Sequence, residues 1–261
     1  MLRTRTAPID DKPKVLEQLS MTPHVVIERG LWRDKQVLIK RLKDMSRKNP
    51  EVLERFEREA EVMAKLDHPN IPKLLQHERG VLVREWVEGR TLYYHIEEER
   101  KLEMPRVLHI ARGVLAAVTH AHSRGVIHLD LKPGNILLED WDRVQVIDFG
   151  CAKDLTLESI THVGARLGTP NYMAPEQYKG TRHDVRSDVY SIGAILYEMS
   201  VGQLPFSDSF AWLAGRGAPP TTWCDHPGLA LVLQKAMQRV PESRYQTALE
   251  MLIALEHLEI T

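Results

Sequence analysis

Short apolar runs separated by polar breaks characterise the first third of the chain. Val25 to Ile27 and Val37 to Ile39 are β-branched or apolar runs, and the turn-rich stretch 28–36 between them contains Gly30. Two such runs around a break predict an antiparallel pair of strands. Two more strands are predicted at 71–75 and 81–87.

The remaining pattern is mainly helical. Apolar residues between positions 50 and 66 recur at helical spacing and predict one helix there. Beyond Gly89, amphipathic or buried helices are predicted at 107–122, 188–200, 229–240 and 245–257. The change at Gly89 separates a small sheet-rich part, residues 21–89, from a larger helical part, residues 90–261. Residues 1–20 are polar and are expected to form a loosely held lead-in.

Composition narrows the class of protein. The 261 residues carry 35 Lys and Arg against 36 Asp and Glu, so the formal charge is −1, which argues against a dedicated nucleic-acid binder. The hydrophobic fraction of 43% argues against disorder. No apolar run approaches the ~20 residues of a membrane-spanning helix, and the first residues lack the apolar stretch of a signal peptide. We therefore expect a cytoplasmic protein with no membrane span.

Three oxygen-bearing side chains lie close together in the sequence. Asp130 and Asn135 flank the Pro133-Gly134 turn, and Asp148 follows the next strand, predicted at 144–147. A hairpin built from the strand at 136–138 and this strand would hold all three groups at one edge. Carboxylate and amide oxygens of this kind suit Mg²⁺, which prefers one or two carboxylates together with substrate phosphates.

From about Val25 to its C-terminus the chain resembles a protein kinase of the eukaryotic-like (Hanks) Ser/Thr type. Its sequence as a whole resembles bacterial members of this family. Residues 128–135 match the catalytic-loop pattern His-Arg-Asp-x-x-x-x-Asn, except that Leu129 replaces the arginine. Residues 148–150 match the metal-binding Asp-Phe-Gly triplet, and 174–176 match the end of the activation segment. The resemblance implies a two-lobed α+β kinase fold, with a small β-rich N-lobe that carries the αC helix and a larger helical C-lobe.

Other residues fit the same family pattern. Lys40 corresponds to the β3 lysine and Glu59 to its αC glutamate partner. Asp188 resembles the anchor in the αF helix, and Arg244 resembles the ion-pair partner of Glu176. Each of these matches is weak alone, and their order and spacing together are specific.

The resemblance implies ATP-dependent phosphorylation of Ser or Thr hydroxyls on protein substrates, with ATP and Mg²⁺ as cofactors in a cleft around Gly89. Asp130 would orient the substrate hydroxyl, Lys132 would offset charge on the γ-phosphate, and Thr169 would help shape the hydroxyl site. The other implied roles are these: Lys40, fixed by Glu59, contacts the α- and β-phosphates; Asn135 and Asp148 hold magnesium; the backbone of Glu85, Trp86 and Val87 meets the adenine edge; and Leu137 lies beneath the ring.

Several positions depart from the family pattern. The phosphate-covering loop lacks its glycines, and the best register places Ser20, Thr22 and Val25 at those positions, with a shift of one residue as the alternative. Leu38 replaces the alanine that packs on adenine, and extra methylenes there should crowd the nucleotide. Leu129 removes the arginine that grips an activation-loop phosphate, so we expect activity that such a phosphate does not gate.

Alternatives remain open at this level. The gatekeeper position, behind the adenine pocket, holds Arg84. We favour an arrangement in which its guanidinium reaches solvent or pairs with an acid; the alternative is that it partly fills the adenine pocket. A pseudokinase scaffold is the alternative function. A small-molecule phosphotransferase is a third hypothesis. The segment 168–176, which resembles a peptide-positioning loop, and Arg244 argue against it. Trp212 and Trp223 flank a Gly/Pro-rich stretch, where core packing is favoured over a docking site.

Overall fold

The computed structural model describes residues 12–140, 143–149, 153–154, 170–181 and 183–258. The chain divides into two compact units, one of residues 1–64 and 72–86 and the other of residues 65–71 and 87–261. The division after Trp86 falls three residues before the predicted one at Gly89. It also assigns the short segment 65–71 to the second unit, which the strand and helix patterns did not predict.

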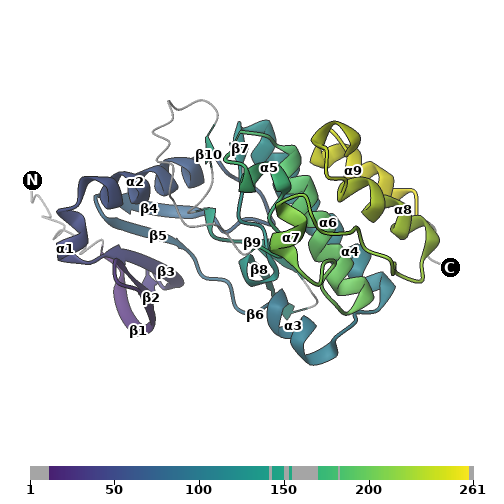
Figure 1. Cartoon of the computed structure of the whole chain (residues 1–261). Coiled ribbons are helices and arrows are strands. Elements are labelled where there is room, and N and C mark those ends of the chain that lie inside the picture. Colours follow the sequence, from purple (N-terminus) through teal and green to yellow (C-terminus); the bar gives the residue numbers. More distant parts are fainter. Residues whose placement is uncertain (1–11, 141–142, 150–152, 155–169, 182, 259–261) are drawn as a thin grey trace, which may run out of the picture. The chain divides into compact units, whose positions relative to one another are not determined.

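The described part of the first unit contains a five-stranded antiparallel sheet in the order β1-β2-β3-β5-β4. Its strands are β1 (Lys14–Met21), β2 (Val25–Trp32), β3 (Lys35–Leu42), β4 (Leu74–Glu78) and β5 (Val81–Glu85). Two helices follow β3: α1 (Asp44–Arg47) and α2 (Pro50–Ala64), and α2 packs alongside β4 (Figure 1). The predicted lead-in of residues 1–20 is therefore too long, because its last residues form β1.

The turn of the β2–β3 hairpin lies within the predicted stretch 28–36 but is much shorter than that stretch. Only Arg33 and Asp34 form it, both with positive φ (51° and 62°), and the strands run up to them on both sides. Gly30, the turn signal within 28–36, is buried inside β2. A Cβ on Gly30 would lie 2.6 Å from Ile39 Cδ1, so this glycine permits close packing and does not make a turn.

Strand β3 separates its side chains between two faces. Val37 and Ile39 are fully buried and pack with Val83 of β5 in a core cluster. Leu38 and Lys40 alternate with them and therefore point to the other face of the sheet. This alternation is the local reason why the β3 lysine is presented away from the core that fixes its strand.

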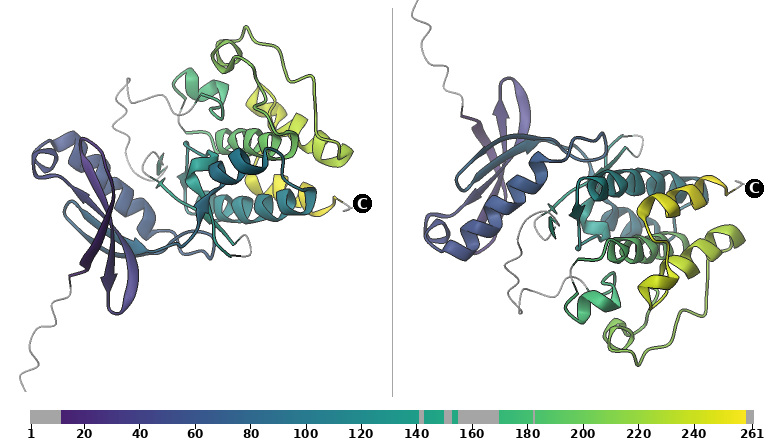
Figure 2. Two further views of the ribbon diagram at one scale, coloured as in Figure 1. Left: turned by 90° about the horizontal axis from the view of Figure 1, so that it is seen from below. Right: turned by 90° about the horizontal axis from the view of Figure 1, so that it is seen from above.

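The second unit is mainly helical (Figure 2). Its longer helices are α3 (Leu92–Glu99), α4 (Met104–Ser123), α6 (Arg186–Val201), α8 (Pro227–Ala236) and α9 (Ala248–Glu256). Its shorter elements are β6 (Arg90–Thr91), β7 (Val126–Ile127), the 3₁₀ turn Pro133–Asn135, β8 (Ile136–Leu138), β9 (Val144–Val146), β10 (Lys153–Asp154), α5 (Pro175–Tyr178), α7 (Ser209–Leu213) and the 3₁₀ turn Pro241–Ser243. Helix α4 packs against both α6 and α9, and α6 packs against α8, so α4 and α6 form the centre of this unit.

The predicted helices are confirmed with small shifts at their ends. The largest shift is at the C-terminal end of the helix predicted at 229–240. This helix, α8, ends at Ala236, because Met237 begins an irregular segment. The strands predicted at 136–138 and 144–147 pair as β8 and β9. Within the described parts of the chain, no helix combines the length and apolarity needed to cross a membrane.

Candidate active site

In the first unit, Lys40 forms the predicted ion pair with Glu59. Its Nζ donates to both carboxylate oxygens of Glu59, at 2.7 and 2.6 Å. The side chains are 18% and 8% exposed, so this pair lies at the edge of the protein interior. Glu59 comes from α2 and Lys40 from β3, and the pair therefore fixes the direction of the lysine ammonium. This is the arrangement that the β3 lysine needs to contact phosphates.

The segment expected to cover the phosphates is a tight turn between β1 and β2. Thr22 donates its backbone N–H to the Val25 carbonyl at 2.8 Å. The Thr22 hydroxyl oxygen accepts the backbone N–H of Val25 at 3.0 Å and that of His24 at 3.3 Å. Pro23, between them, has no N–H. The backbone N–H groups of Thr22, His24 and Val25 are thus all hydrogen-bonded within the turn.

Contacts to the segment after β3 hold the same turn in place. The Lys43 backbone N–H donates to the His24 carbonyl at 2.9 Å. The His24 ring nitrogen Nδ1 and the Ser46 hydroxyl lie 3.1 Å apart, within hydrogen-bond distance. A glycine-rich loop is flexible because glycine has wide conformational freedom. Here a threonine, a proline and a histidine form a turn tied to its neighbours.

The sheet face that carries Lys40 also carries the two substituted adenine-site positions. Leu38 pairs in register with Arg29 of β2 on one side and with Arg84 of β5 on the other. Directly paired residues share a face in an antiparallel sheet, so Leu38 lies between two arginines. Arg29 forms an ion pair with Glu17 at 3.0 Å. Leu38 and Arg84 are both half-buried, so the preference for a guanidinium that reaches a partner or solvent stays a prediction.

In the second unit, three predicted catalytic-loop side chains meet. Lys132 Nζ donates to Asp130 Oδ2 at 2.7 Å, and Asn135 Nδ2 donates to the same oxygen at 3.1 Å. Asn135 Nδ2 also donates to the Asp130 backbone carbonyl at 2.8 Å. The 3₁₀ turn Pro133–Asn135 returns the chain so that residue 135 faces residue 130. The predicted grouping of Asp130, Lys132 and Asn135 is therefore present.

These contacts leave one oxygen of Asn135 available for a cation. A backbone carbonyl can only accept, so the amide nitrogen of Asn135 faces Asp130 and its Oδ1 faces away. No hydrogen bond to this Oδ1 is found among the described residues, although Asn135 is only 5% exposed. Asp148 follows β9, is exposed, and has φ of +64°, in the left-handed region. An amide oxygen without a protein donor, together with an exposed carboxylate, is a donor set that fits Mg²⁺.

Asp188 holds the backbone of the catalytic loop from beneath. Its Oδ2 accepts the His128 N–H at 2.8 Å and its Oδ1 accepts the Leu129 N–H at 2.9 Å. Leu129 has φ of +64°, a costly conformation for a residue with a side chain, and the carboxylate offsets that cost. His122 Nε2 donates to Oδ2 at 2.9 Å. Burial raises the pKa of Asp188, but the hydrogen bond and charge of His122 outweigh it, so the pKa lies below its usual value.

His128 links the loop to the Asp148 segment. Its Nδ1 accepts the Asp130 N–H at 3.3 Å, so Nε2 carries the proton that is donated to the Ile147 carbonyl at 3.1 Å. The ring lies 4.7 Å from the ring of Phe149. Leu129, which replaces the family arginine, is an aliphatic residue without a cation, and it is 5% exposed. Gln177, which the sequence patterns did not identify, donates Nε2 to the Leu129 carbonyl at 2.9 Å.

The predicted pair Glu176–Arg244 is buried. Arg244 donates to both oxygens of Glu176, at 2.7 and 2.8 Å, and it is 2% exposed. Its remaining donors reach the carbonyls of Arg186, Gln238 and Arg239. Bidentate contact and complete hydrogen bonding are the conditions under which a buried ion pair is tolerated.

Two predicted site residues fall outside the described parts, and the contacts of the others with adenine are not tested. Thr169 falls outside the described residues, as does Gly150 of the Asp-Phe-Gly triplet. Leu137 is half-buried in β8, and Val87 is buried at the start of the second unit. The Glu85 backbone N–H donates to the Lys73 carbonyl at 3.0 Å, so this N–H group is not available to donate to adenine. The adenine contacts therefore stay predictions.

The sequence matches the model of the protein kinase domain over residues 24–215. The chain therefore belongs to the protein kinase family. It is 38% identical over 235 residues to a probable serine/threonine-protein kinase of Clostridium perfringens, a match that covers 85% of this chain and 34% of that protein. It is 33% identical over 240 residues to the serine/threonine-protein kinase PrkC of Bacillus subtilis, covering 87% and 37%.

A third relative is the serine/threonine-protein kinase PknB of Mycobacterium tuberculosis, 34% identical over 245 residues, with 87% of this chain and 39% of that protein covered. The chain thus spans between a third and two fifths of the length of these relatives. The family and the resemblance to Hanks-type bacterial Ser/Thr kinases, together with the α+β kinase fold class, are confirmed by these matches.

Proposed function

We propose that this chain transfers the γ-phosphoryl group of ATP to Ser or Thr hydroxyls of protein substrates. The observation that carries the proposal is the catalytic loop, in which Lys132 and Asn135 both donate to one oxygen of Asp130. That carboxylate oxygen is oriented by two donors, and the other is left to accept a proton from a substrate hydroxyl. Phosphoryl transfer depends mainly on such positioning and on charge stabilisation.

Each unit supplies part of this chemistry. In the first, Lys40 is a cation with one fixed partner, suited to contact the α- and β-phosphates. In the second, Asn135 and Asp148 would hold magnesium, which when bound neutralises charge on the phosphate oxygens. Lys132 offers a second cation, for the γ-phosphate. Similarity to proteins named serine/threonine-protein kinases supports Ser and Thr as the acceptor residues.

Transfer of labelled phosphate tests the proposal. Wild type and Asp130→Asn are incubated with Mg²⁺ and γ-labelled ATP, and label is followed on the chain itself and on a generic basic protein. Removing a positioned acid–base group costs about 10²–10⁴-fold in rate, so Asp130→Asn should lose at least 100-fold. The matched control is Asp140→Asn, an exposed aspartate near the end of the β8 segment, which should label as wild type does.

Two outcomes would contradict the assignment. Equal residual labelling in wild type and Asp130→Asn would favour the pseudokinase alternative, in which the fold serves binding only. Label that appears on small hydroxylated metabolites but not on protein would favour a small-molecule phosphotransferase. Chelation of Mg²⁺ should abolish labelling in wild type, because the Asn135 and Asp148 oxygens need a cation to bring phosphate close to them.

A further inference from the structure

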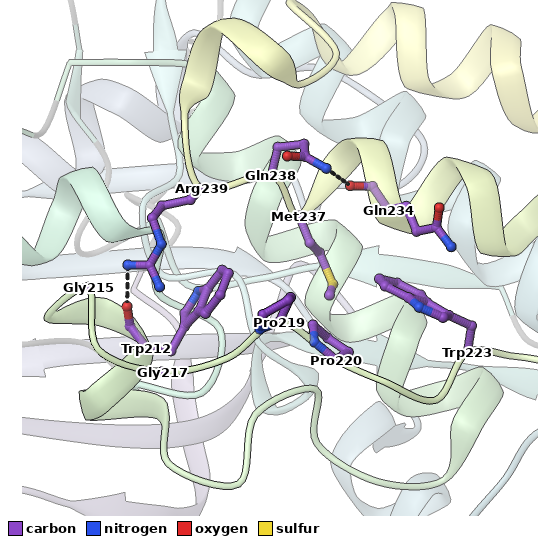
Figure 3. A pocket seen from close by; sticks show the side chains of 10 residues that line it. All are labelled: Trp212, Gly215, Gly217, Pro219, Pro220, Trp223, Gln234, Met237, Gln238 and Arg239. Atoms are coloured by element: carbon purple, nitrogen blue, oxygen red, sulfur yellow. Dashed lines mark hydrogen bonds between the residues drawn. The ribbon is translucent and has the colours of Figure 1, made fainter.

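A cavity of about 400 Å³ lies in the second unit, away from the catalytic loop in sequence (Figure 3). Its walls come from α7, the segment 214–226 that follows it, and the end of α8. The side chains that matter for its chemistry are Trp212, Pro219, Pro220, Trp223, Met237 and Arg239. This volume is within the range of small-ligand pockets.

The two tryptophans that the sequence singled out behave differently. Trp212 is 6% exposed, donates its indole N–H to the Tyr190 hydroxyl at 2.7 Å, and stacks on Phe206 at 4.3 Å between ring centroids. Trp212 is therefore packed in the core, as the sequence pattern favoured. Trp223 is half-buried and meets Tyr197 edge-on at 5.7 Å. Its indole N–H has no acceptor among the described residues, so this donor is available to a ligand.

Arg239 places a fixed cation at one end of the cavity. Its guanidinium carbon lies 3.9 Å from the centroid of the Trp212 ring, and Nη1 donates to the Trp212 carbonyl at 2.5 Å (Figure 3). Within the described parts of the chain, no carboxylate pairs with Arg239. A guanidinium held by stacking and one hydrogen bond keeps its remaining N–H groups preorganised for a carboxylate.

The surroundings of the cavity favour an acidic ligand. Arg216, in the connecting segment beside Gly215 and Gly217, also forms no ion pair with any described residue. The nearby Asp225 is committed to Lys101 at 2.5 Å. Arg239 is the charged residue of the cavity lining, and the lining contains no carboxylate from the described residues. An interface selects a partner of complementary charge, so this cavity suits an acidic one.

The remaining lining fits an extended peptide. Pro219, Pro220 and Met237 provide apolar surface between the two tryptophans. The Gln234 side-chain amide has no hydrogen-bond partner among the described residues, since only its backbone carbonyl accepts from Gln238, at 2.9 Å. Grooves with aromatic walls and isolated donors for backbone carbonyls are the surfaces that bind proline-containing extended segments.

We propose that this cavity docks an extended segment of a protein partner, in which a proline or aliphatic side chain packs on Pro219, Pro220 and the half-buried Trp223 and an adjacent acidic side chain pairs with Arg239. The suggestion that this partner is a substrate depends on the function proposed above. The binding itself does not, because no group of the catalytic loop takes part in it.

Direct binding tests the proposal without ATP. The probe is a fluorescein-labelled peptide Pro-Leu-Pro-Pro-Glu-Glu, titrated with the whole chain and followed by fluorescence anisotropy. Arg239→Gln should raise the dissociation constant at least tenfold, and Trp223→Phe, which keeps an aromatic ring but removes the indole N–H, should raise it severalfold. The matched control Arg124→Gln, at an exposed arginine after α4, should change it less than twofold.

Charge exchange gives the sharpest discrimination. Arg239→Glu should lose the acidic peptide and gain the same peptide with Lys-Lys in place of Glu-Glu. Thermal unfolding confirms that each variant is folded. Absence of binding up to millimolar peptide, equal binding of acidic and basic peptides by wild type, or unchanged binding by Arg239→Gln would each overturn the proposal.

A kinetic readout separates docking from catalysis. Fusing the acidic segment to a phosphoacceptor peptide should lower its KM, and Arg239→Gln should remove this difference while kcat stays unchanged. If no variant transfers phosphate but wild type still binds the probe, the proposed function fails and the docking site stands. If transfer occurs and the fused segment leaves KM unchanged, the docking role in substrate selection is wrong.

Discussion

The predicted site residues of the first unit and those of the second differ in what holds them in place. In the second unit, the catalytic loop rests on Asp188, which is fully buried and accepts three hydrogen bonds from His122, His128 and Leu129. In the first unit, Lys40 keeps its glutamate, while the turn at 22–24 and Leu38 depart from the family pattern. The groups that we propose for phosphoryl transfer and those that we propose to hold the nucleotide are thus positioned by separate contacts, and one set can vary while the other is retained.

The largest effect should follow from Asp188→Asn, because it acts on the buried support of the catalytic loop. The carboxylate accepts at both oxygens, whereas an asparagine would turn an NH₂ group toward a backbone N–H. Removing a partner from a buried charged network costs about 3–5 kcal/mol. Equilibrium unfolding in urea should show that loss, and phosphate transfer should fall with it. Asp140→Asn serves again as the exposed control.

The pH dependence of the unfolding free energy shows whether the charge of Asp188 causes this loss of stability. The pKa of Asp188 is lowered in the folded chain, so its contribution to stability is complete above the unfolded pKa near 3.8 and is lost as pH falls through the lower folded value. The difference in unfolding free energy between wild type and Asp188→Asn should therefore be present at pH 5 and shrink below about pH 4. A difference that stays constant down to pH 3 would mean that packing, not charge, causes the loss.

Leu38→Ala tests the other side of the comparison. If the leucine crowds the adenine, removing its extra carbons should restore about 1–3 kcal/mol, which lowers the dissociation constant for Mg²⁺-ATP by about 5- to 150-fold. Calorimetric titration measures this directly. Leu31→Ala, an exposed truncation in β2, is the matched control and should leave the affinity unchanged. Equal affinity in wild type and Leu38→Ala would remove the crowding argument.

Much of the site could be predicted because its residues are specified by chemistry and by order. Lys40 with Glu59, and Glu176 with Arg244, pair as the family pattern implied, since a buried or half-buried charge needs an opposite charge. The hairpin of β8 and β9 followed from two apolar runs around a short polar break. In these cases one local signal and one long-range requirement agreed.

Other features depended on packing that a sequence pattern does not contain. Gly30 looked like a turn residue, yet the approach of Ile39 to its backbone places it inside β2. One wall of the cavity beside Trp223 is Trp212, which is held by the Tyr190 hydroxyl of α6, 22 residues away in sequence, and by stacking on Phe206. Helix and strand periodicity reports which face is apolar, and it does not report whether that face is filled.

The smallest effect is expected at the turn that replaces the phosphate loop. Thr22→Val keeps the shape of the side chain and removes the oxygen that accepts from Val25 and His24. The turn is exposed, so water can replace these bonds, and the loss in unfolding free energy should be only about 0.5–1.5 kcal/mol. Hydrogen exchange should quicken at the Val25 amide in particular, while the catalytic-loop amides that Asp188 binds keep their protection.

Thr91→Val is the control for this substitution, because the Thr91 hydroxyl forms no hydrogen bond with any described residue. The affinity for Mg²⁺-ATP decides what the turn does. If the committed amides merely replace a flexible cover, loosening them leaves the affinity unchanged within about twofold. A dissociation constant that falls markedly in Thr22→Val would show that the freed amides reach phosphate, and the first unit would then hold nucleotide through the same backbone groups as a glycine-rich loop.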